Sequence, residues 1–155
     1  MVFDSNILIS ALMFPGKQAE KAIVRTIEGR DQLLISKPIV VEVLEVIARK
    51  FARDPEELAR VAVFLADLAD IVRPRRRIRV LKDDADNRIL ECAVTADADL
   101  IVTGDQAMLE LGGFEGIRTY RCEHIWKRKK ARVRSGETRE LREINQRRAR
   151  AEQRE

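Results

Sequence analysis

The hydrophobic positions along the chain fall into two patterns. Short, mainly apolar runs are typical of strands that are covered on both faces, and longer stretches with a helical period are typical of amphipathic helices. The short runs predict strands at residues 2–4, 32–36, 70–74, 100–103 and 117–120. The longer stretches predict helices at residues 6–13, 18–28, 37–51, 55–69, 83–96 and 106–111.

The alternation of strands with helical stretches predicts an α/β domain with a mainly parallel sheet. The chain has 155 residues, 45% of them hydrophobic and 36% charged, which is enough for one domain with a hydrophobic core and a charged surface. No apolar run reaches the ~18 residues of a membrane-spanning helix. The uncharged stretch at residues 5–16 follows an aspartate and has no basic leader, unlike a signal peptide. We therefore expect a cytoplasmic protein without a membrane segment.

The two cysteines give no sign of a disulfide framework or a zinc site. Cys92 and Cys122 are too few for a framework, and we expect both as reduced thiols. Cys122 lies near His124, but two such ligands do not make a zinc site. His124 is the only histidine, and Cys92 falls within a predicted helix, so neither offers an obvious nucleophile.

The net charge of +4 conceals an asymmetry between the body and the C-terminal tail. Residues 127–155 carry 12 Lys/Arg against 5 Asp/Glu, a net charge of +7. Residues 1–126 then carry 18 Lys/Arg against 21 Asp/Glu, a net charge of −3. The tail also lacks an apolar stripe, so we expect a charged extension, helical or disordered, attached to a mildly acidic domain.

Two aspartates stand where open α/β sheets bind their ligands, beyond the carboxyl ends of strands. Asp4 ends the first strand, and Asp105 follows the strand in the segment LIVTGD. If these two strands are neighbours, which the sequence alone does not establish, the two carboxylates converge. Converging carboxylates repel one another unless a proton or a cation lies between them, and Mg²⁺ or Mn²⁺ prefers such oxygen ligands.

Two further acids are candidates for the same site, and each has a structural alternative. Asp86 belongs to a run of acids at a helix start, where capping and the helix dipole favour acids in any case. Glu42 shares a helical face with Glu45 and Arg49, which suits an ordinary solvated face with an i, i+4 ion pair. Its neighbours at i−3 and i+4, Ile39 and Val46, are apolar, so a partly covered glutamate stays open as the other interpretation.

Four segments of the chain, taken together and in order, resemble the PIN-domain family. They are VFDSNILISAL, LLISKPIVVEVLEVIARKF, DDADNRILECAVTADADLIVTGDQAML and FEGIRTYRCEHI. The similarity is greatest to the branch of VapC-like toxins of toxin–antitoxin systems. It covers about residues 1–126 and not the tail at residues 127–155. The resemblance implies a three-layer α/β/α sandwich around a short, mainly parallel sheet, and a Mg²⁺- or Mn²⁺-dependent nuclease acting on single-stranded RNA.

The resemblance also implies roles for individual residues. The four acids of the family correspond to Asp4, Glu42, Asp86 and Asp105, and the polar residues beside the first and fourth acids correspond to Asn6 and Thr103. We expect Asp4, Asp86 and Asp105 to hold the metal and Glu42 to orient or deprotonate the attacking water. Asn6 and Thr103 would hold these carboxylates by hydrogen bonds. The chain departs from the family in having Ser5 where threonine is usual and in its short first strand, and neither departure changes an acid.

Other functions stay open at this point. A phosphatase could use Asp4 as its nucleophile, although Asn6 stands where a second acid would be usual. A PIN fold could bind RNA or a protein without cleaving, or could process RNA in a housekeeping role. The toxin interpretation implies a small antitoxin partner and a homodimer.

The basic tail has two interpretations as well. It is a solvated extension, or it is an arm that binds RNA. In the second case its first cations would contact the phosphates, namely Arg128, Lys129, Lys130, Arg132 and Arg134.

Overall fold

Six strands form one sheet within residues 1–125, in the order β3-β2-β1-β4-β6-β5. The structure is a computed structural model and describes residues 1–128. The strands are β1 (Val2–Phe3), β2 (Leu34–Ser36), β3 (Asp70–Val72), β4 (Leu100–Val102), β5 (Gly113–Phe114) and β6 (Ile117–Tyr120). Every pairing except that of β5 with β6 is parallel, which confirms the predicted mainly parallel sheet.

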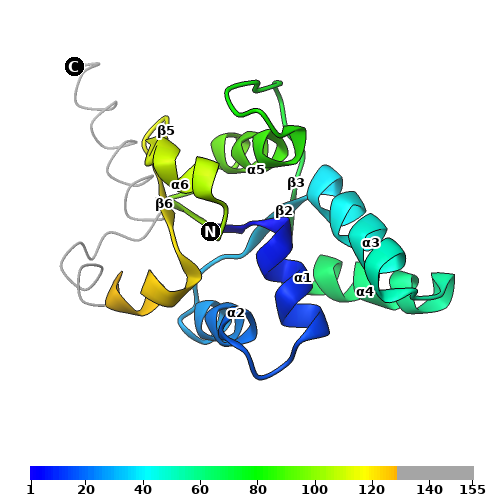
Figure 1. The fold of residues 1–155 in the computed structure, drawn as a ribbon. Helices are drawn as coiled ribbons and strands as arrows, with labels where there is room; N and C mark the ends of the chain where they lie inside the picture. Colours follow the sequence, from blue (N-terminus) through cyan, green and yellow to red (C-terminus); the bar gives the residue numbers. More distant parts are fainter. Residues whose placement is uncertain (129–155) are drawn as a thin grey trace, which may run out of the picture. The chain divides into compact units, whose positions relative to one another are not determined.

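Helices cover both sides of this sheet. They are α1 (Ser5–Met13), α2 (Gln18–Glu28), α3 (Lys37–Phe51), α4 (Pro55–Leu68), α5 (Asp84–Thr95), α6 (Gln106–Leu111) and the 3₁₀ segment η1 (Cys122–Arg128). Figure 1 shows α5 and α6 on one side of the strands and α1, α2 and α4 on the other. The chain runs from β1 through β2 to β3, and then crosses back to β4 and on to β6. Because connections between parallel strands are right-handed, the helices of the first half and those of the second half lie on opposite faces of the sheet. The predicted three-layer α/β/α sandwich is therefore confirmed.

The five predicted strands and six predicted helices are all present, with small differences at their ends. The short strand β5 and the 3₁₀ segment η1 were not predicted. Gly112 ends α6, and Gly113 directly after it begins β5. Its φ is +153°, and a Cβ atom there would lie 2.8 Å from the carbonyl oxygen of Ile117. A two-residue strand that begins with an obligatory glycine has no hydrophobic period to reveal it.

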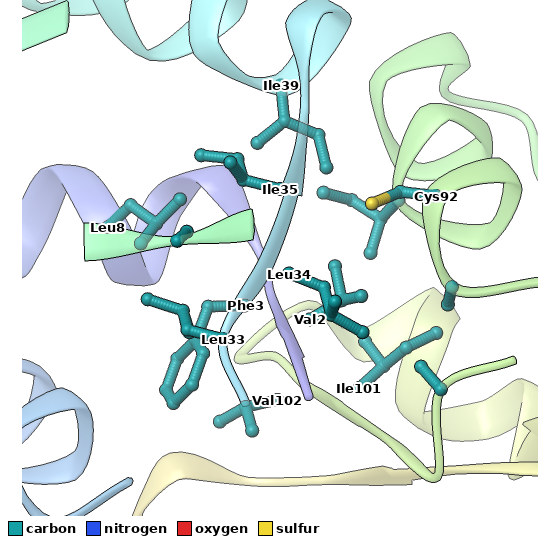
Figure 2. Packing of buried hydrophobic residues seen from close by; sticks show 14 of the residues in the cluster. Val2, Phe3, Leu8, Leu33, Leu34, Ile35, Ile39, Cys92, Ile101 and Val102 are labelled. Atoms are coloured by element: carbon teal, nitrogen blue, oxygen red, sulfur yellow. The ribbon is translucent and has the colours of Figure 1, made fainter. Parts of the chain in front are cut away.

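The core consists mainly of aliphatic side chains, and those of the central strands alternate between the two faces of the sheet. Figure 2 shows Val2 beside Leu34 and Ile101, whereas Phe3 projects toward the opposite face. Val2 and Phe3 are 0% and 1% exposed, although β1 has only these two residues. Burial on both faces is what a central parallel strand requires, and it holds the end of β1 in a fixed place.

The helices and the cysteines each allow one further statement. Among the helices of residues 1–128, none is long and apolar enough to cross a membrane. Cys92 and Cys122 are both free thiols, as predicted.

Candidate active site

The strands that carry Asp4 and Asp105 are neighbours. β1 pairs with β4 in parallel, with Phe3 opposite Val102, so Asp4 and Thr103 leave the sheet side by side. The Asp4 N–H donates to the carbonyl oxygen of Val102 at 2.8 Å, which continues the ladder by one step. The condition that the sequence left open is therefore met, and the two aspartates lie at the same edge of the sheet.

Thr103 connects the two aspartates through its hydroxyl group. The hydroxyl donates to Oδ2 of Asp4 at 2.5 Å and accepts the backbone N–H of Asp105 at 2.9 Å. Thr103 is 0% exposed and Asp4 is 3% exposed, so water does not compete for these bonds. Thr103 thus has a geometry that matches the predicted role of a residue that positions carboxylates.

Each aspartate also caps the helix that follows it. Oδ1 of Asp4 accepts the N–H of Asn6 at 3.0 Å at the start of α1, and Oδ1 of Asp105 accepts the N–H of Met108 at 2.9 Å at the start of α6. These bonds fix the orientation of both carboxylates. Asn6 was expected to contact Asp4, and it does so through its backbone N–H, while its side chain is exposed.

Glu42 joins this site from the third helix. The hydroxyl of Ser5 donates to Oε2 of Glu42 at 2.6 Å, which links α1 to α3. The alternative of a solvated face with a Glu45–Arg49 ion pair is not supported, because no ion pair joins these two side chains in the described part of the chain. Glu42 instead points toward the segment that follows β1.

The three acids at the start of α5 have three different environments. Asp83 caps the helix by accepting the N–H of Ala85 at 2.9 Å. Asp84 is exposed and lies 3.5 Å from Arg88. Asp86 neither caps the helix nor forms an ion pair within residues 1–128, and it interacts electrostatically with Asp4, Glu42 and Asp105 instead. Asp86 therefore joins the other three acids, and we call these four residues the carboxylate cluster.

Burial and mutual repulsion favour the protonated form of three members of this cluster. Burial, and then the charges of Asp105, Asp4, Asp83 and Glu42, raise the pKa of Asp86 to about 7. Burial also raises the pKa of Asp4, although the bonds from Thr103 and Asn6 oppose that change. Burial likewise raises the pKa of Glu42, against the opposing bond from Ser5. Each shift means that a negative charge at this edge is costly without a compensating positive charge.

No side chain in the described part of the chain supplies that positive charge. Within the described residues, no Lys, Arg or His forms an ion pair with a member of the carboxylate cluster. Within residues 1–128, no three of these acids lie close enough together to bind a bare metal ion directly. Mg²⁺, however, keeps several waters and is usually bound through one or two carboxylates. The donor set therefore fits a hydrated, hard divalent cation.

Two residues of the site were not assigned a role from the sequence. Ser5 is 2% exposed and holds Glu42, and its hydroxyl beside Asp4 was the only signal available. Asp83 acts electrostatically on Asp4, Glu42 and Asp86, but its place in an acidic run at a helix start resembles ordinary capping. Four of the five cations predicted in an RNA-binding tail lie outside the described residues: Lys129, Lys130, Arg132 and Arg134. Arg128 ends η1.

Comparison with known proteins gives the same fold and names the family. A PIN domain profile matches residues 1–107. The uncharacterized protein MJ1680 of Methanocaldococcus jannaschii is 26% identical over 115 residues, which are 72% of this chain and 74% of that protein.

Two solved structures share the fold at low sequence identity. VapBC2 from Rickettsia felis, bound to a DNA fragment from its promoter, has a TM-score of 0.60 and 12% identity over 78% of this chain and 98% of the other. VapBC-1 from nontypeable Haemophilus influenzae has a TM-score of 0.58 and 15% identity over 79% of this chain and 99% of the other.

The profile match covers the sheet through β4, with all four acids of the carboxylate cluster. The chain belongs to the PIN-domain family. PIN domains are nucleases that generally use divalent metal ions.

Proposed function

We propose that this protein is a Mg²⁺- or Mn²⁺-dependent endoribonuclease that cleaves single-stranded RNA and is the toxin of a toxin–antitoxin pair. The observation that supports this most strongly is the carboxylate cluster: four acids from separate segments, partly or fully buried, and without a basic partner in residues 1–128. Such a cluster persists only where a cation or protons neutralise it. A phosphodiester is already anionic, so the same cation makes the site able to receive it.

The residues of the site have different roles in this proposal. Asp4, Asp86 and Asp105 are the ligands for the cation, either directly or through water. When bound, the cation orients the phosphate, lowers the pKa of a bound water and offsets negative charge in the transition state. Thr103 and the helix caps keep Asp4 and Asp105 in place before substrate arrives, so little reorganisation is needed during the reaction.

Glu42 is suited to the proton transfer. Its carboxylate is oriented by Ser5, and burial raises its pKa above that of a free glutamate, which makes it a better base. It would orient the attacking water and take its proton. The buried thiol of Cys92 does not compete as a nucleophile, because burial raises its pKa to about 12.

A protein partner is part of the proposal. The VapBC structures are named for assemblies of two kinds of chain, and we propose a small antitoxin and a homodimer here. Val63 and Phe64 on α4 are 62% and 51% exposed, whereas Leu65 beside them is 1% exposed. One side of α4 therefore packs in the core, and the other side presents an apolar surface to a partner.

The test is cleavage of a labelled single-stranded RNA by the purified full chain. We expect cleavage with Mg²⁺ or Mn²⁺, none with EDTA, and recovery when excess metal is restored. Undiminished cleavage in EDTA would rule out the metal mechanism, and RNA binding without cleavage would favour a binding module. A small gene immediately upstream, whose product blocks cleavage, would separate the toxin from a housekeeping nuclease.

A further inference from the structure

Three polar side chains of α5 play no part in the carboxylate cluster, although two of them are buried. Asn87 and Glu91 are 1% and 2% exposed, and Thr95 follows one turn later. Together with the cap Asp83, they stand four residues apart, which places them in one row along the helix. Buried polar side chains need hydrogen-bond partners, and the partners of this row indicate its structural role.

The side chains of this row form hydrogen bonds with the main chain of the segment between β3 and α5. The N–H groups of Val80 and Leu81 donate to Oδ1 of Asn87 at 3.2 and 2.9 Å, and Nδ2 of Asn87 donates to the carbonyl oxygen of Leu81 at 2.9 Å. The segment therefore lies beside the first turns of α5, close to the carboxylate cluster.

The same segment is held further along the helix as well. The N–H of Ile78 donates to Oε1 of Glu91 at 2.8 Å, and the N–H of Arg75 donates to Thr95 at 3.1 Å. The segment thus runs antiparallel to α5, whose length from Thr95 to Asp83 is about 18 Å at 1.5 Å per residue. Figure 1 shows this connection, in green, beside α5.

The side chains of this segment are strongly basic. Residues 73–82, which we call the basic strap, contain six cations and no acid: Arg73, Arg75, Arg76, Arg77, Arg79 and Lys82. The rest of residues 1–126 carries 12 Lys/Arg against 21 Asp/Glu, so the strap is a local reversal of charge. All six side chains belong to exposed residues.

Most of these cations are available to a ligand. Within residues 1–128, Arg76 pairs with Glu115 and Arg77 lies 3.9 Å from Glu91, whereas the other four cations form no ion pair. Because the main-chain bonds and the buried side chain of Ile78 hold the strap, its cations are presented on an ordered backbone. Such order lowers the entropy lost when a ligand binds.

We propose that the basic strap binds the phosphates of single-stranded RNA and leads the strand along α5 to the carboxylate cluster. This inference rests on the proposed function. The strap ends at Lys82, and the next residue, Asp83, already interacts with Asp4, Glu42 and Asp86. A row of cations that ends beside an acidic phosphodiester-cleaving site offsets the repulsion that RNA meets there.

The position of the strap, which ends beside the proposed phosphodiester-cleaving site, favours RNA phosphates over an acidic protein. Five of its six cations are arginines, whose planar guanidinium group matches the oxygens of phosphates and carboxylates alike, so composition does not choose between the two. The strap has no aromatic residue on which bases could stack, so its binding should tolerate many sequences and depend strongly on salt.

The test measures binding of a labelled single-stranded RNA to the full chain carrying Asp4→Asn and Asp105→Asn, so that the RNA is not cut. Arg73→Gln, Arg75→Gln and Arg79→Gln together should weaken binding about tenfold or more at low salt. The slope of log affinity against log salt should become shallower by about 2, since each lost phosphate contact contributes ~0.7. The matched control is Lys17→Gln, Lys21→Gln and Lys50→Gln, which removes the same charge from exposed positions at the start of α2, within α2 and near the end of α3.

The control should weaken binding less than about threefold, because it changes only the overall charge. Arg→Lys at the three strap positions should retain most of the salt slope. Thr95→Val, which removes an anchor of the strap without changing charge, should weaken binding by about fivefold or less. Equal weakening by the strap and control variants, or no weakening by either, would overturn the proposal.

The same data separate this inference from the proposed function. A wild-type chain that cuts RNA, together with strap variants that bind like the control, would refute only the strap. A wild-type chain that cuts no RNA with Mg²⁺ or Mn²⁺, together with a parent chain that binds no RNA at any salt concentration, would refute both.

Discussion

Helix α5 belongs to two regions of opposite charge, and the two are built in opposite ways. At its first turn, Asp86 meets acids from distant segments, and Asp4 is bonded to a residue 99 positions away in the sequence. Along its side, the basic strap is ten consecutive residues held by a row of side chains on the next helix. The carboxylate cluster is partly or fully buried and forms no ion pair within residues 1–128, whereas the six cations of the strap are exposed.

This difference assigns the two regions different tasks. Buried carboxylates with raised pKa values gain from a bound cation, so the cluster is suited to chemistry. Exposed arginines lose little hydration when they contact phosphate and act over a longer distance, so the strap is suited to capture. Changes to the cluster should therefore lower kcat, and changes to the strap should raise KM.

The largest effect is expected from Asp4→Asn and Asp105→Asn. Each replacement keeps the size of the side chain and removes a charge that cation binding needs, so RNA cleavage should fall about 100-fold or more. The metal-free protein should stay folded and melt at the same or a higher temperature, because fewer like charges meet. Cleavage within a few-fold of wild type in either variant would place the chemistry elsewhere.

The next largest effect is a dependence of stability and of cation affinity on pH. Replacing Asp86 should remove it. Its folded pKa of about 7 lies above the ordinary value of 3.8, so the folded protein holds a proton that the unfolded chain releases. The metal-free protein should therefore lose stability as the pH rises from about 4 to 7. Cation binding requires that proton to leave, so affinity should fall up to about tenfold per pH unit below 7.

Melting curves across this pH range, with and without Mg²⁺, check that prediction. Asp86→Asn should flatten the metal-free curve, and Asp84→Asn is the control, because Asp84 is exposed and pairs with Arg88. A curve for Asp86→Asn that keeps the slope of wild type would contradict the assignment.

A smaller effect should come from releasing the strap at Asn87. Asn87→Ala removes three hydrogen bonds and leaves two main-chain N–H groups without their acceptor, which should cost about 1–3 kcal/mol of unfolding free energy. Urea denaturation measures this loss. Asn6→Ala changes an exposed asparagine on α1 and should stay within about 0.5 kcal/mol of wild type. Equal midpoints for the two variants would mean that the strap is not anchored at Asn87.

The smallest effect concerns the tail. A chain that ends at Lys127 should keep its fold and its cleavage chemistry, because the carboxylate cluster and the sheet lie within residues 1–125. If residues 128–155 are an RNA-binding arm, which is the second of their two interpretations, binding should weaken and its salt slope should become shallower by about 0.7 per lost contact. Identical binding curves for both chains would leave the strap as the basic element that matters.

The two regions also differ in how far the sequence reveals them. The acids that end β1 and follow β4 were predicted from strand ends and from the family resemblance, since strand position and residue type are both visible in the sequence. Their convergence depended on strand order, which nothing local determines. Ser5 was not assigned a role, because only the packing of α1 on α3 brings its hydroxyl to Glu42.

The strap shows a different limit. Its charges are plain in the sequence, but a run of arginines is most often a solvated surface. Its significance depends on Asn87, Glu91 and Thr95 accepting its main-chain N–H groups, and those acceptors look like ordinary helical polar residues. Strand β5 was missed for a related reason, since it is defined by its pairing with β6 and not by its own two residues.

The most direct test of the account is a calorimetric titration of Mn²⁺ into the metal-free full chain. Wild type and the strap variant with Arg73, Arg75 and Arg79 replaced by glutamine should bind Mn²⁺ with equal affinity. Asp4→Asn and Asp105→Asn should each weaken that binding about tenfold or more, since each removes a ligand charge. Equal binding by all four proteins, or no binding by wild type, would contradict the claim that the carboxylate cluster is the metal site of this nuclease.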